Sequence, residues 1–414
     1  MNRREFLVGP AALLAGSPLA HAQGAREVVV GAVYPMSGPN AQIGVDAKTA
    51  METVMEIVNN ASELDLPTAK NAGLEGLGGA KLRVIFADHQ GDPQKGRAEA
   101  ERLITQEKIC AIVGAFHSSV SSTVSIACER YKVPYVVADS TSPNLNRRNL
   151  SYFFRTTAHD EMFTIVMFDF LDALKAKGQP INTVGLVYED TQFGTDSSAV
   201  QRRLAGERGY KVVSDIKYRS SSPSLTAEVQ MIKNANPDVL MPSSYTTDAI
   251  LLVKTMGELG YKPKNIVAQA AGFAEKAVYD SVGDQLQGLI SRASFSLDLA
   301  VKRPSVGKVN DMFKAKASRD LNDNTSRQFM ALLVLADAID RAKSVDGGAI
   351  RDALAATNIP GERTIMPWKR VRFGPDGQNY DADPVLIQYE KGKWVTVFPE
   401  QAAVAAAQWP MNKT

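Results

Sequence analysis

Three clusters of polar side chains are the part of this sequence best suited to chemistry. They run from Pro35 to Pro39, from His117 to Ser119 and from Asp139 to Pro143. Each follows a short apolar run that predicts a β-strand. Serine hydroxyls, together with backbone N–H groups at the start of a helix, can hold an anionic carboxylate. Serine and threonine also cap helices, so one cluster alone is weak, but the three together predict a carboxylate-binding site.

The signatures of enzymes are mostly missing from the chain. It has no Walker A phosphate loop, no Gly-x-Ser-x-Gly elbow, no His-Glu-x-x-His helix and no Cys-x-x-Cys pair. Ser214–Lys217 matches a Ser-x-x-Lys pattern, but it lies along an expected strand without the accompanying motifs. His89, His117 and His159 are scattered, which argues against a metal site and a histidine-based triad. We therefore expect a binding protein, with no enzymatic activity, no metal and no cofactor.

The composition is that of an ordinary globular protein. The chain has 414 residues, 44% of them hydrophobic and 22% charged, which is enough for more than one core. Lys and Arg number 47 against 45 Asp and Glu, and no basic run stands out. Nucleic acid is therefore not an expected partner.

The N-terminus predicts export from the cytoplasm. Arg3 and Arg4 precede an apolar stretch over residues 6–19, and the run from Ala20 to Ala22 fits a small-x-small cleavage site. We expect residues 1–22 to be a signal peptide that is removed, which leaves a soluble periplasmic protein. The arginine pair resembles a twin-arginine signal, and export by the general secretory route is the alternative.

From Glu27 onward, short β-branched apolar runs alternate with helical patterns, which is typical of parallel sheets covered on both faces. The expected strands cover residues 28–34, 82–87, 111–115, 135–138, 183–188, 211–216, 239–242 and 266–269. The expected helices cover residues 45–59, 93–107, 119–131, 161–177, 197–209, 225–236 and 247–260. Residues 60–79 read as a surface loop, residues 288–356 as helix-rich, and the tail beyond them as a turn followed by a return of the chain.

Two cysteines in an exported chain raise the question of a disulfide. Cys110 opens an expected strand, and Cys128 lies late on the helix that runs back toward the beginning of that strand. The two side chains can meet in space on this topology. A Cys110–Cys128 bridge and a pair of small buried side chains are both compatible with the sequence.

Several short motifs carry a family resemblance through their order and spacing. They are Gly31–Pro39, Asp88 with Asp92 and Pro93, Ile112–Gly114, Ser118 with Ser119, Ser140–Pro143, Phe154–Thr157, Val187–Asp190, and Phe193 with Gly194. With these motifs the chain from Val28 to Val397 resembles the type I periplasmic binding proteins of the branched-chain amino acid and amide uptake family.

The resemblance implies an α/β fold of two Rossmann-like lobes, each with a parallel central sheet, joined by a three-strand hinge. Lobe one is expected to take residues 27–156 and 292–366, and lobe two residues 157–291 and 367–400, followed by a tail over 401–414. A ligand then binds between the lobes and closes them. We expect a monomer that binds a small carboxylate or amino acid and delivers it to the permease subunits of an ABC transporter.

The resemblance also implies which residues bind the ligand. In lobe one, Ser118, Thr141 and the backbone of Asp139 match the positions that hold the carboxylate of an amino acid, next to Ser119 and Ser140. In lobe two, the matching positions are Phe193, Tyr245 and Ala271. The first-loop position that is often aromatic in the family is Ile43 here.

Ala271 stands where the family places the acid that receives the ligand's ammonium group. An ammonium enclosed without a partner costs several kcal/mol. Either Asp190, Asp248 or Glu275 takes this role, or the ligand has no amine and is an aromatic, aliphatic or keto acid that fits Phe193, Tyr245 and Phe273.

We expect the solute-binding component of an ABC uptake transporter, with a branched-chain amino acid or a related compound as its ligand. A binder of amine-free acids is the alternative within transport. A ligand-sensing receptor on the same fold and a periplasmic enzyme are rivals from other classes.

Overall fold

The computed structural model describes residues 26–270 and 272–411. The predicted signal peptide over residues 1–22 and the predicted site residue Ala271 lie outside the described residues. Across the part of the chain that is described, every helix is too short or too polar to span a bilayer.

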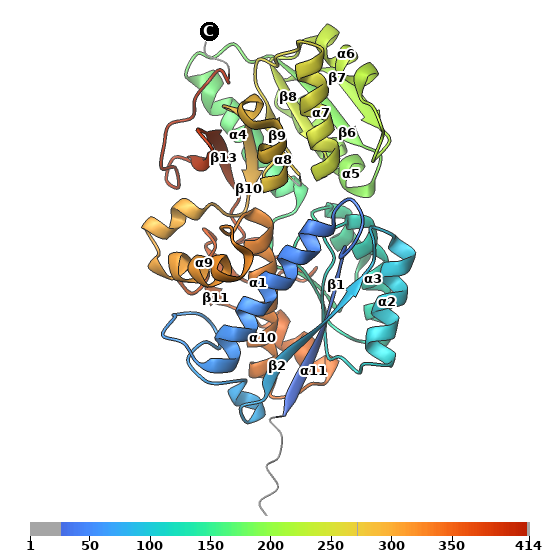
Figure 1. Cartoon of the computed structure of the whole chain (residues 1–414), viewed down its shortest axis with the longest axis vertical. Helices are drawn as coiled ribbons and strands as arrows, with labels where there is room; N and C mark the ends of the chain where they lie inside the picture. The colour runs from blue at the N-terminus through green and yellow to red at the C-terminus, as the bar shows by residue number, and fades with distance from the viewer. Residues whose placement is uncertain (1–25, 271, 412–414) are drawn as a thin grey trace, which may run out of the picture.

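The first lobe is built on a parallel sheet of five strands (Figure 1). Its strands are β1 (Glu27–Tyr34), β2 (Lys81–Asp88), β3 (Ile112–Gly114), β4 (Tyr135–Val137) and β5 (Phe153–Arg155), in the order β2-β1-β3-β4-β5. The inner strands β1, β3 and β4 are buried on both faces, which is why their sequences run nearly without polar residues, whereas the edge strand β2 is only partly buried.

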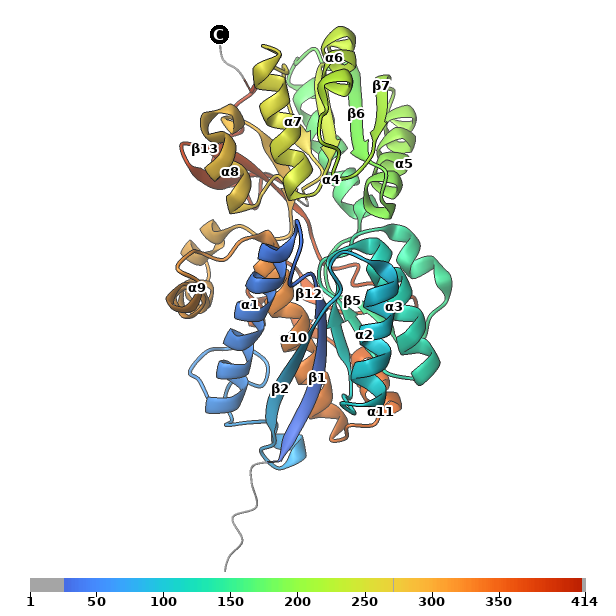
Figure 2. The ribbon, with the colours of Figure 1, turned by 45° about the vertical axis from the view of Figure 1, so that its right-hand side comes forward.

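Helices cover both faces of this sheet (Figure 2). They are α1 (Ala41–Asn60), α2 (Pro93–Thr105), α3 (Ser118–Tyr131), α9 (Pro304–Ala317), α10 (Asp323–Ala342) and α11 (Gly347–Ala355). Helices α2 and α3 pack on one face, whereas α1 and α10 pack on the other. Helix α10 comes from late in the chain, and its buried residues continue almost without a break from Asp323 to Ala336.

The second lobe repeats the strand order of the first. It contains β6 (Thr183–Glu189), β7 (Lys211–Tyr218), β8 (Val239–Ser243), β9 (Val267–Ala268), β10 (Ile290–Ala293), β13 (Val385–Glu390) and β14 (Lys393–Phe398). A single parallel bridge between Leu240 and Ile266 joins the three-stranded order β7-β6-β8 to the four-stranded order β9-β10-β13-β14. The last two strands form an antiparallel hairpin at the edge.

The helices of the second lobe are α4 (Asp160–Ala176), α5 (Gln192–Glu207), α6 (Thr226–Ala235), α7 (Thr246–Glu258) and α8 (Lys276–Val282). Short 3-10 turns lie at Glu75–Leu77, Pro143–Arg148, Gly283–Leu286, Leu297–Val301 and Gly361–Arg363. The prediction of an α/β fold with two Rossmann-like lobes is confirmed. The helix expected over 197–209 begins earlier, at Gln192.

The chain crosses between the lobes three times, and the third crossing comes later than expected. Strands β11 (Ile359–Pro360) and β12 (Arg370–Val371) pair within lobe one, and Trp368 and Phe373 lie in its core. The N–H of Asn379 still bonds the carbonyl of Arg155 in β5, at 3.0 Å. The expected boundary at residue 366 is therefore too early, because the aromatic side chains beyond it pack against lobe one.

The expected separate tail also packs against a lobe. Gln408 exchanges hydrogen bonds with Gln388 of β13, and the N–H of Met411 donates to Asn265 at 2.9 Å. Residues 401–411 thus form part of lobe two.

Both cysteines are free and buried. Cys110 belongs to the core on the α1 side of the first sheet, whereas Cys128 packs in the core on the α3 side. Burial raises the pKa of the Cys110 thiol to about 12 and that of Cys128 still further. The bridge that the sequence left open is not formed, because the sheet separates the two side chains.

Candidate functional site

The candidate site lies where the carboxyl ends of the two sheets face each other, as doubly wound sheets place their ligands. In lobe one, the segments after β3 and β4 carry Ser118 and Thr141 to the side that faces lobe two. In lobe two, the starts of α5 and α7 follow β6 and β8 and point back.

The lobes touch on both sides of this site. On one side, Asp196 of α5 accepts hydrogen bonds from Ser142 and from Asn144 of lobe one. On the other side, Glu275 of lobe two accepts from Asn322, at 3.1 Å, and from Asn324. The structure therefore has the closed arrangement.

A small cavity is enclosed between these contacts. Its volume is about 10 Å³, roughly the space of one water molecule. It is lined by Phe116, Ser118, Asp139, Thr141, Phe193, Tyr245, Arg292, Asn324 and Arg327. Both lobes contribute side chains to the lining.

Five of the residues singled out from the sequence meet at this cavity, namely Ser118, Asp139, Thr141, Phe193 and Tyr245. The fold positions them through short turns that follow buried strands. Ser118 is the first residue of α3 and 1% exposed, and Thr141 follows β4 and is 2% exposed. Two hydroxyls and a helix start are thus held at one wall.

Ser140 and Ser119 do not line the cavity. The hydroxyl of Ser140 donates to the carbonyl of Phe116 at 3.0 Å and contacts the hydroxyl of Ser121 at 2.6 Å. It therefore holds the loop after β4 against the segment after β3. Ser119 lies on α3, partly buried. Their expected contact with a ligand is not supported by this geometry, because alternate residues of a turn point to opposite sides.

Aromatic rings of both lobes close over the cavity. The ring centroid of Tyr245 lies 5.2 Å from those of Phe116 and Phe193, and 4.9 Å from that of His117. Burial lowers the pKa of His117 to about 3, so this imidazole is neutral. Phe273, considered as a further contact, is instead packed in the core of lobe two.

Arg292 is the most informative residue that sequence reasoning missed. Its side chain is 1% exposed, and within the described chain neither its Nε nor its Nη1 atom has a hydrogen-bond partner. The nearest carboxylates are Asp323, at 3.6 Å from Nη1, and Asp160, at 3.9 Å from Nη2. Burial lowers the pKa of Arg292 to about 10, which still leaves it charged at neutral pH.

Arg327, in contrast, has its hydrogen bonds satisfied by protein atoms. It donates to the carbonyls of Asp323 and Asp139, at 3.1 and 3.2 Å, and pairs with the carboxylate of Asp323 at 2.9 Å. This arginine therefore supports the walls, whereas Arg292 keeps donor capacity for an anion. A planar guanidinium matches a carboxylate with two parallel hydrogen bonds.

Asp139 contributes its side chain to the cavity as well as its backbone. One carboxylate oxygen, Oδ2, accepts from Gln328 at 3.2 Å, and the buried hydroxyl of Tyr34 also bonds to this carboxylate. Burial raises the pKa of Asp139 to about 6 and outweighs the attraction of Arg327. An ionisable acid therefore lies in the same cavity as the donors of Arg292 that lack hydrogen-bond partners.

The other candidate acids serve different purposes. Asp190 accepts from the N–H of Ser220 at 2.9 Å, and Asp248 accepts from the N–H of Ser221 at 3.1 Å, so both hold the loop after β7. Glu275 bridges the lobes outside the cavity. Ile43 is buried in the core of lobe one. Across residues 26–270 and 272–411, no group of three His, Cys, Asp or Glu side chains is placed to hold a metal.

Comparison with known proteins points to one family. Residues 27–393 match the family described as periplasmic binding protein. Leu/Ile/Val-binding protein homolog 7 of Brucella suis biovar 1 is 26% identical over 421 residues, which cover 99% of this chain and 100% of that protein.

Solved structures share the fold. The leucine binding protein LivK of Thermotoga maritima aligns with a TM-score of 0.75 at 21% identity, over 89% of this chain and 97% of that chain. A solute binding protein of an ABC transporter from Rhodopseudomonas palustris BisB5, in complex with 3,4-dihydroxybenzoic acid, aligns with a TM-score of 0.73 at 18% identity, over 89% and 95%. The resemblance inferred from the sequence motifs is confirmed, and this chain belongs to the periplasmic binding protein family.

Proposed function

We propose that this protein is the periplasmic solute-binding component of an ABC uptake transporter and that it binds a small carboxylate-bearing solute between its lobes. The cavity of about 10 Å³ is too small for such a solute, so the lobes must open to admit it and then close around it with a wider space between them than in the empty protein. The form closed over the solute is what the permease recognises. The protein acts by binding and release, without a catalytic step. The signal peptide expected over residues 1–22 provides the route to the periplasm.

The observation that carries this proposal is the buried guanidinium of Arg292 in the interlobe cavity, whose Nε and Nη1 atoms have no hydrogen-bond partner in the described chain. Buried charged donors without hydrogen bonds are costly, and Asp323 and Asp160 stand too far from Arg292 to supply good ones, so a ligand can stabilise this group. A carboxylate carries the charge opposite to that of the guanidinium and offers two oxygens that accept hydrogen bonds. The hydroxyls of Ser118 and Thr141 line the same cavity and add donors for the same group.

The carboxylate of Asp139, which lines the same cavity, favours a ligand with an amine. An α-amino acid gives Arg292 a carboxylate and Asp139 an ammonium, so both buried charges find partners. In this proposal Asp139 takes the role that Ala271 cannot fill. The similarity to a Leu/Ile/Val-binding protein homolog and to a leucine binding protein supports the same ligand class.

A second candidate ligand is an aromatic acid. The three rings of Phe116, Phe193 and Tyr245 line the cavity and suit a planar ring. A phenolic hydroxyl can donate to Asp139 in place of an ammonium. The structural neighbour that holds 3,4-dihydroxybenzoic acid supports this candidate.

The experiment is a calorimetric titration of the mature protein with three ligands. Leucine and its keto acid, 4-methyl-2-oxopentanoate, have the same carbon skeleton and differ in the amine, and 4-hydroxybenzoate represents the aromatic acids. Binding of leucine alone supports the amino-acid proposal, and binding of 4-hydroxybenzoate alone supports the second candidate. If Arg292→Gln binds the preferred ligand as tightly as the wild type does, the proposed site is wrong.

A further inference from the structure

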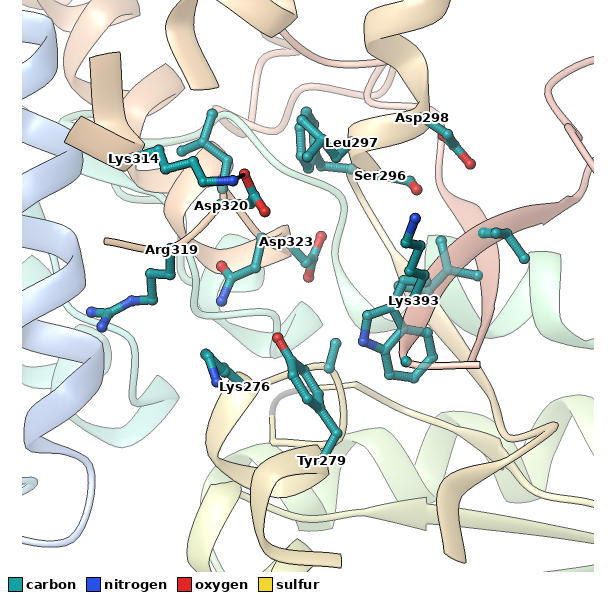
Figure 3. A pocket seen from close by; sticks show the side chains of 18 of the residues that line it. Lys276, Tyr279, Ser296, Leu297, Asp298, Lys314, Arg319, Asp320, Asp323 and Lys393 are labelled. Carbon is teal, nitrogen blue, oxygen red and sulfur yellow. Dashed lines mark ion pairs between the residues drawn. The ribbon is translucent and has the colours of Figure 1, made fainter. Parts of the chain in front are cut away.

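A second, larger cavity opens between the lobes on the side of α8 and α9 (Figure 3). Its volume is about 640 Å³, which lies in the range of small-molecule sites. Lys276 and Tyr279 come from α8 of lobe two, Lys314 comes from α9 of lobe one, and Lys393 comes from the β13–β14 hairpin. We call this space the lateral cavity.

The lateral cavity is separated from the cleft site by the first turn of α10. Asp323 lines the lateral cavity, whereas the next residue, Asn324, lines the cleft cavity. Glu275 accepts hydrogen bonds from Asn322 and Asn324 and so closes the wall between the two spaces. The two cavities therefore offer separate surfaces to ligands.

Buried donors without acceptors lie in the wall of the lateral cavity. Ser296 is 6% exposed and lines it, and within the described residues its hydroxyl has no hydrogen-bond partner. Trp394 lines the same space, and its indole Nε1 is buried and also has no hydrogen-bond partner within the described chain. An indole N–H donates only, so the atom that meets it must be an acceptor.

The charged side chains of the lining leave one cation free. Lys314 pairs with Asp320 at 3.0 Å, Lys276 pairs with Asp280 at 2.6 Å, and Arg319 pairs with Asp46. The carboxylates of the lining are also engaged, since Asp298 accepts from Thr396 and Asp323 accepts from Ser294. Among the described lining residues, Lys393 is the one cation and Asp298 the one carboxylate without an ion-pair partner. Lys393, together with the donors of Ser296 and Trp394, is therefore the part of the lining that can hold an anion.

The remaining wall is aromatic. Tyr279 stacks on Tyr389 with ring centroids 5.7 Å apart, and Tyr389 meets Trp394 edge-on at 5.3 Å. Phe295 and Leu297 complete the apolar surface. Such a wall receives a planar ring, with its acidic group turned toward Ser296, Trp394 and Lys393.

We propose that the lateral cavity is a second binding site, separate from the cleft site, and that it takes an aromatic monocarboxylate. A ligand there contacts lobe one, lobe two and the crossing segment that carries Ser296, so it stabilises the closed arrangement. By linkage, its occupancy raises the affinity of the cleft site, and the cleft ligand raises its affinity by the same factor. This inference does not depend on the ligand proposed for the cleft.

The test follows the indole N–H of Trp394 by two-dimensional ¹⁵N NMR during titration with 2-naphthoate. The chain has three tryptophans, and Trp394→Phe identifies the signal by its disappearance. The titration uses wild type and Arg292→Gln, in which the cleft site is disabled. We expect a saturable shift of the Trp394 signal in both proteins, and a dissociation constant about tenfold higher in Lys393→Gln, an exposed position where the fold tolerates change.

Three results would overturn the proposal. One is a Trp394 signal that does not move in wild type. Another is a shift that disappears in Arg292→Gln, which means that the signal reports closure by a cleft ligand only. The third is equal binding of the neutral alcohol 2-naphthalenemethanol, because a site without preference for the anion is not the one proposed. A Ser296→Ala variant, checked by thermal unfolding, gives a second measure of the donor set.

Discussion

The guanidinium of Arg292 lies over the ring of Phe163, with its central carbon 3.9 Å from the ring centroid. Stacking uses the face of the guanidinium and leaves its edge, where all the N–H donors lie, free for other contacts. Asp160 and Asp323 stand at 3.9 and 3.6 Å, too far to use these donors fully. Phe163 thus orients an anion-binding group before any anion arrives.

Replacing Arg292 should abolish tight binding of a carboxylate ligand. We expect Arg292→Gln to weaken binding by about 2–5 kcal/mol, because the ligand carboxylate then lies in the closed cavity without its cation. Isothermal titration calorimetry measures the loss. Arg147→Gln is the matched control, since Arg147 is 64% exposed and pairs with Glu161 on the surface. Equal losses in both variants would refute the role of Arg292.

Removing the two hydroxyls of the lobe-one wall should lower the affinity for any carboxylate ligand, whether or not the ligand has an amine. Each hydrogen bond to a charged group contributes roughly 1.5–3 kcal/mol. We therefore expect Ser118→Ala combined with Thr141→Ala to weaken binding by a few kcal/mol, with about one such increment for each of the two hydroxyls. Ser119→Ala is the control, because Ser119 does not line the cavity. An unchanged dissociation constant in the double variant would remove these residues from the site.

The pH dependence of binding should report whether an amine meets Asp139, whose pKa is raised to about 6. An ammonium needs the ionised carboxylate, so affinity for an amino acid rises as pH increases through 6. A keto acid brings a second negative charge, so its affinity falls over the same range. Titrations between pH 5 and 8 measure both trends. Asp139→Asn should flatten them, and a persistent pH dependence in that variant would assign the effect to another group.

Closure of the empty protein should also depend on pH, through Glu275. Burial raises the pKa of Glu275 to about 7 in the closed form, with Asp323 and Asp139 adding to the effect and Asn324 and Arg327 opposing it. The contribution of Glu275 to closure is fully present below its ordinary pKa of 4.5, declines as pH rises from there, and is lost once pH has passed through 7. Small-angle scattering at pH 6 and 8.5 should show opening at the higher pH. Glu275→Gln should remain equally closed at both.

Thiol chemistry tests the state of the two cysteines. Cys110 and Cys128 are free and buried in separate cores. We expect a thiol reagent to titrate two groups in the unfolded protein without reductant, and almost none in the folded protein, because a buried thiol has a raised pKa and little access. A titration that finds no thiol after unfolding would establish a bridge.

Much of the fold follows from local pattern. β-Branched runs such as Val28–Tyr34 alternate with helical stretches, and this period alone predicts a doubly wound architecture. In any doubly wound sheet, the polar turns after β3 and β4 lie at the carboxyl edge of the strands. The sequence therefore predicts Ser118 and Thr141 as ligand-binding residues, and both line the cavity. The β13–β14 hairpin was expected only as a turn and a return of the chain, since its strands lie late and at an edge.

The sequence by itself thus determined the elements, the family and one wall of the site, because these depend on residues close together in the chain. Tertiary structure alone decided the other wall. In the sequence, Arg292 is a lone charge in the short buried strand Ile290–Ala293. Its role can be inferred only from the folded chain, where Phe163, Asp160 and Asp323 approach it from other segments. Burial, which comes from packing between distant segments, sets the pKa of Asp139 and leaves the donors of Arg292 unpaired.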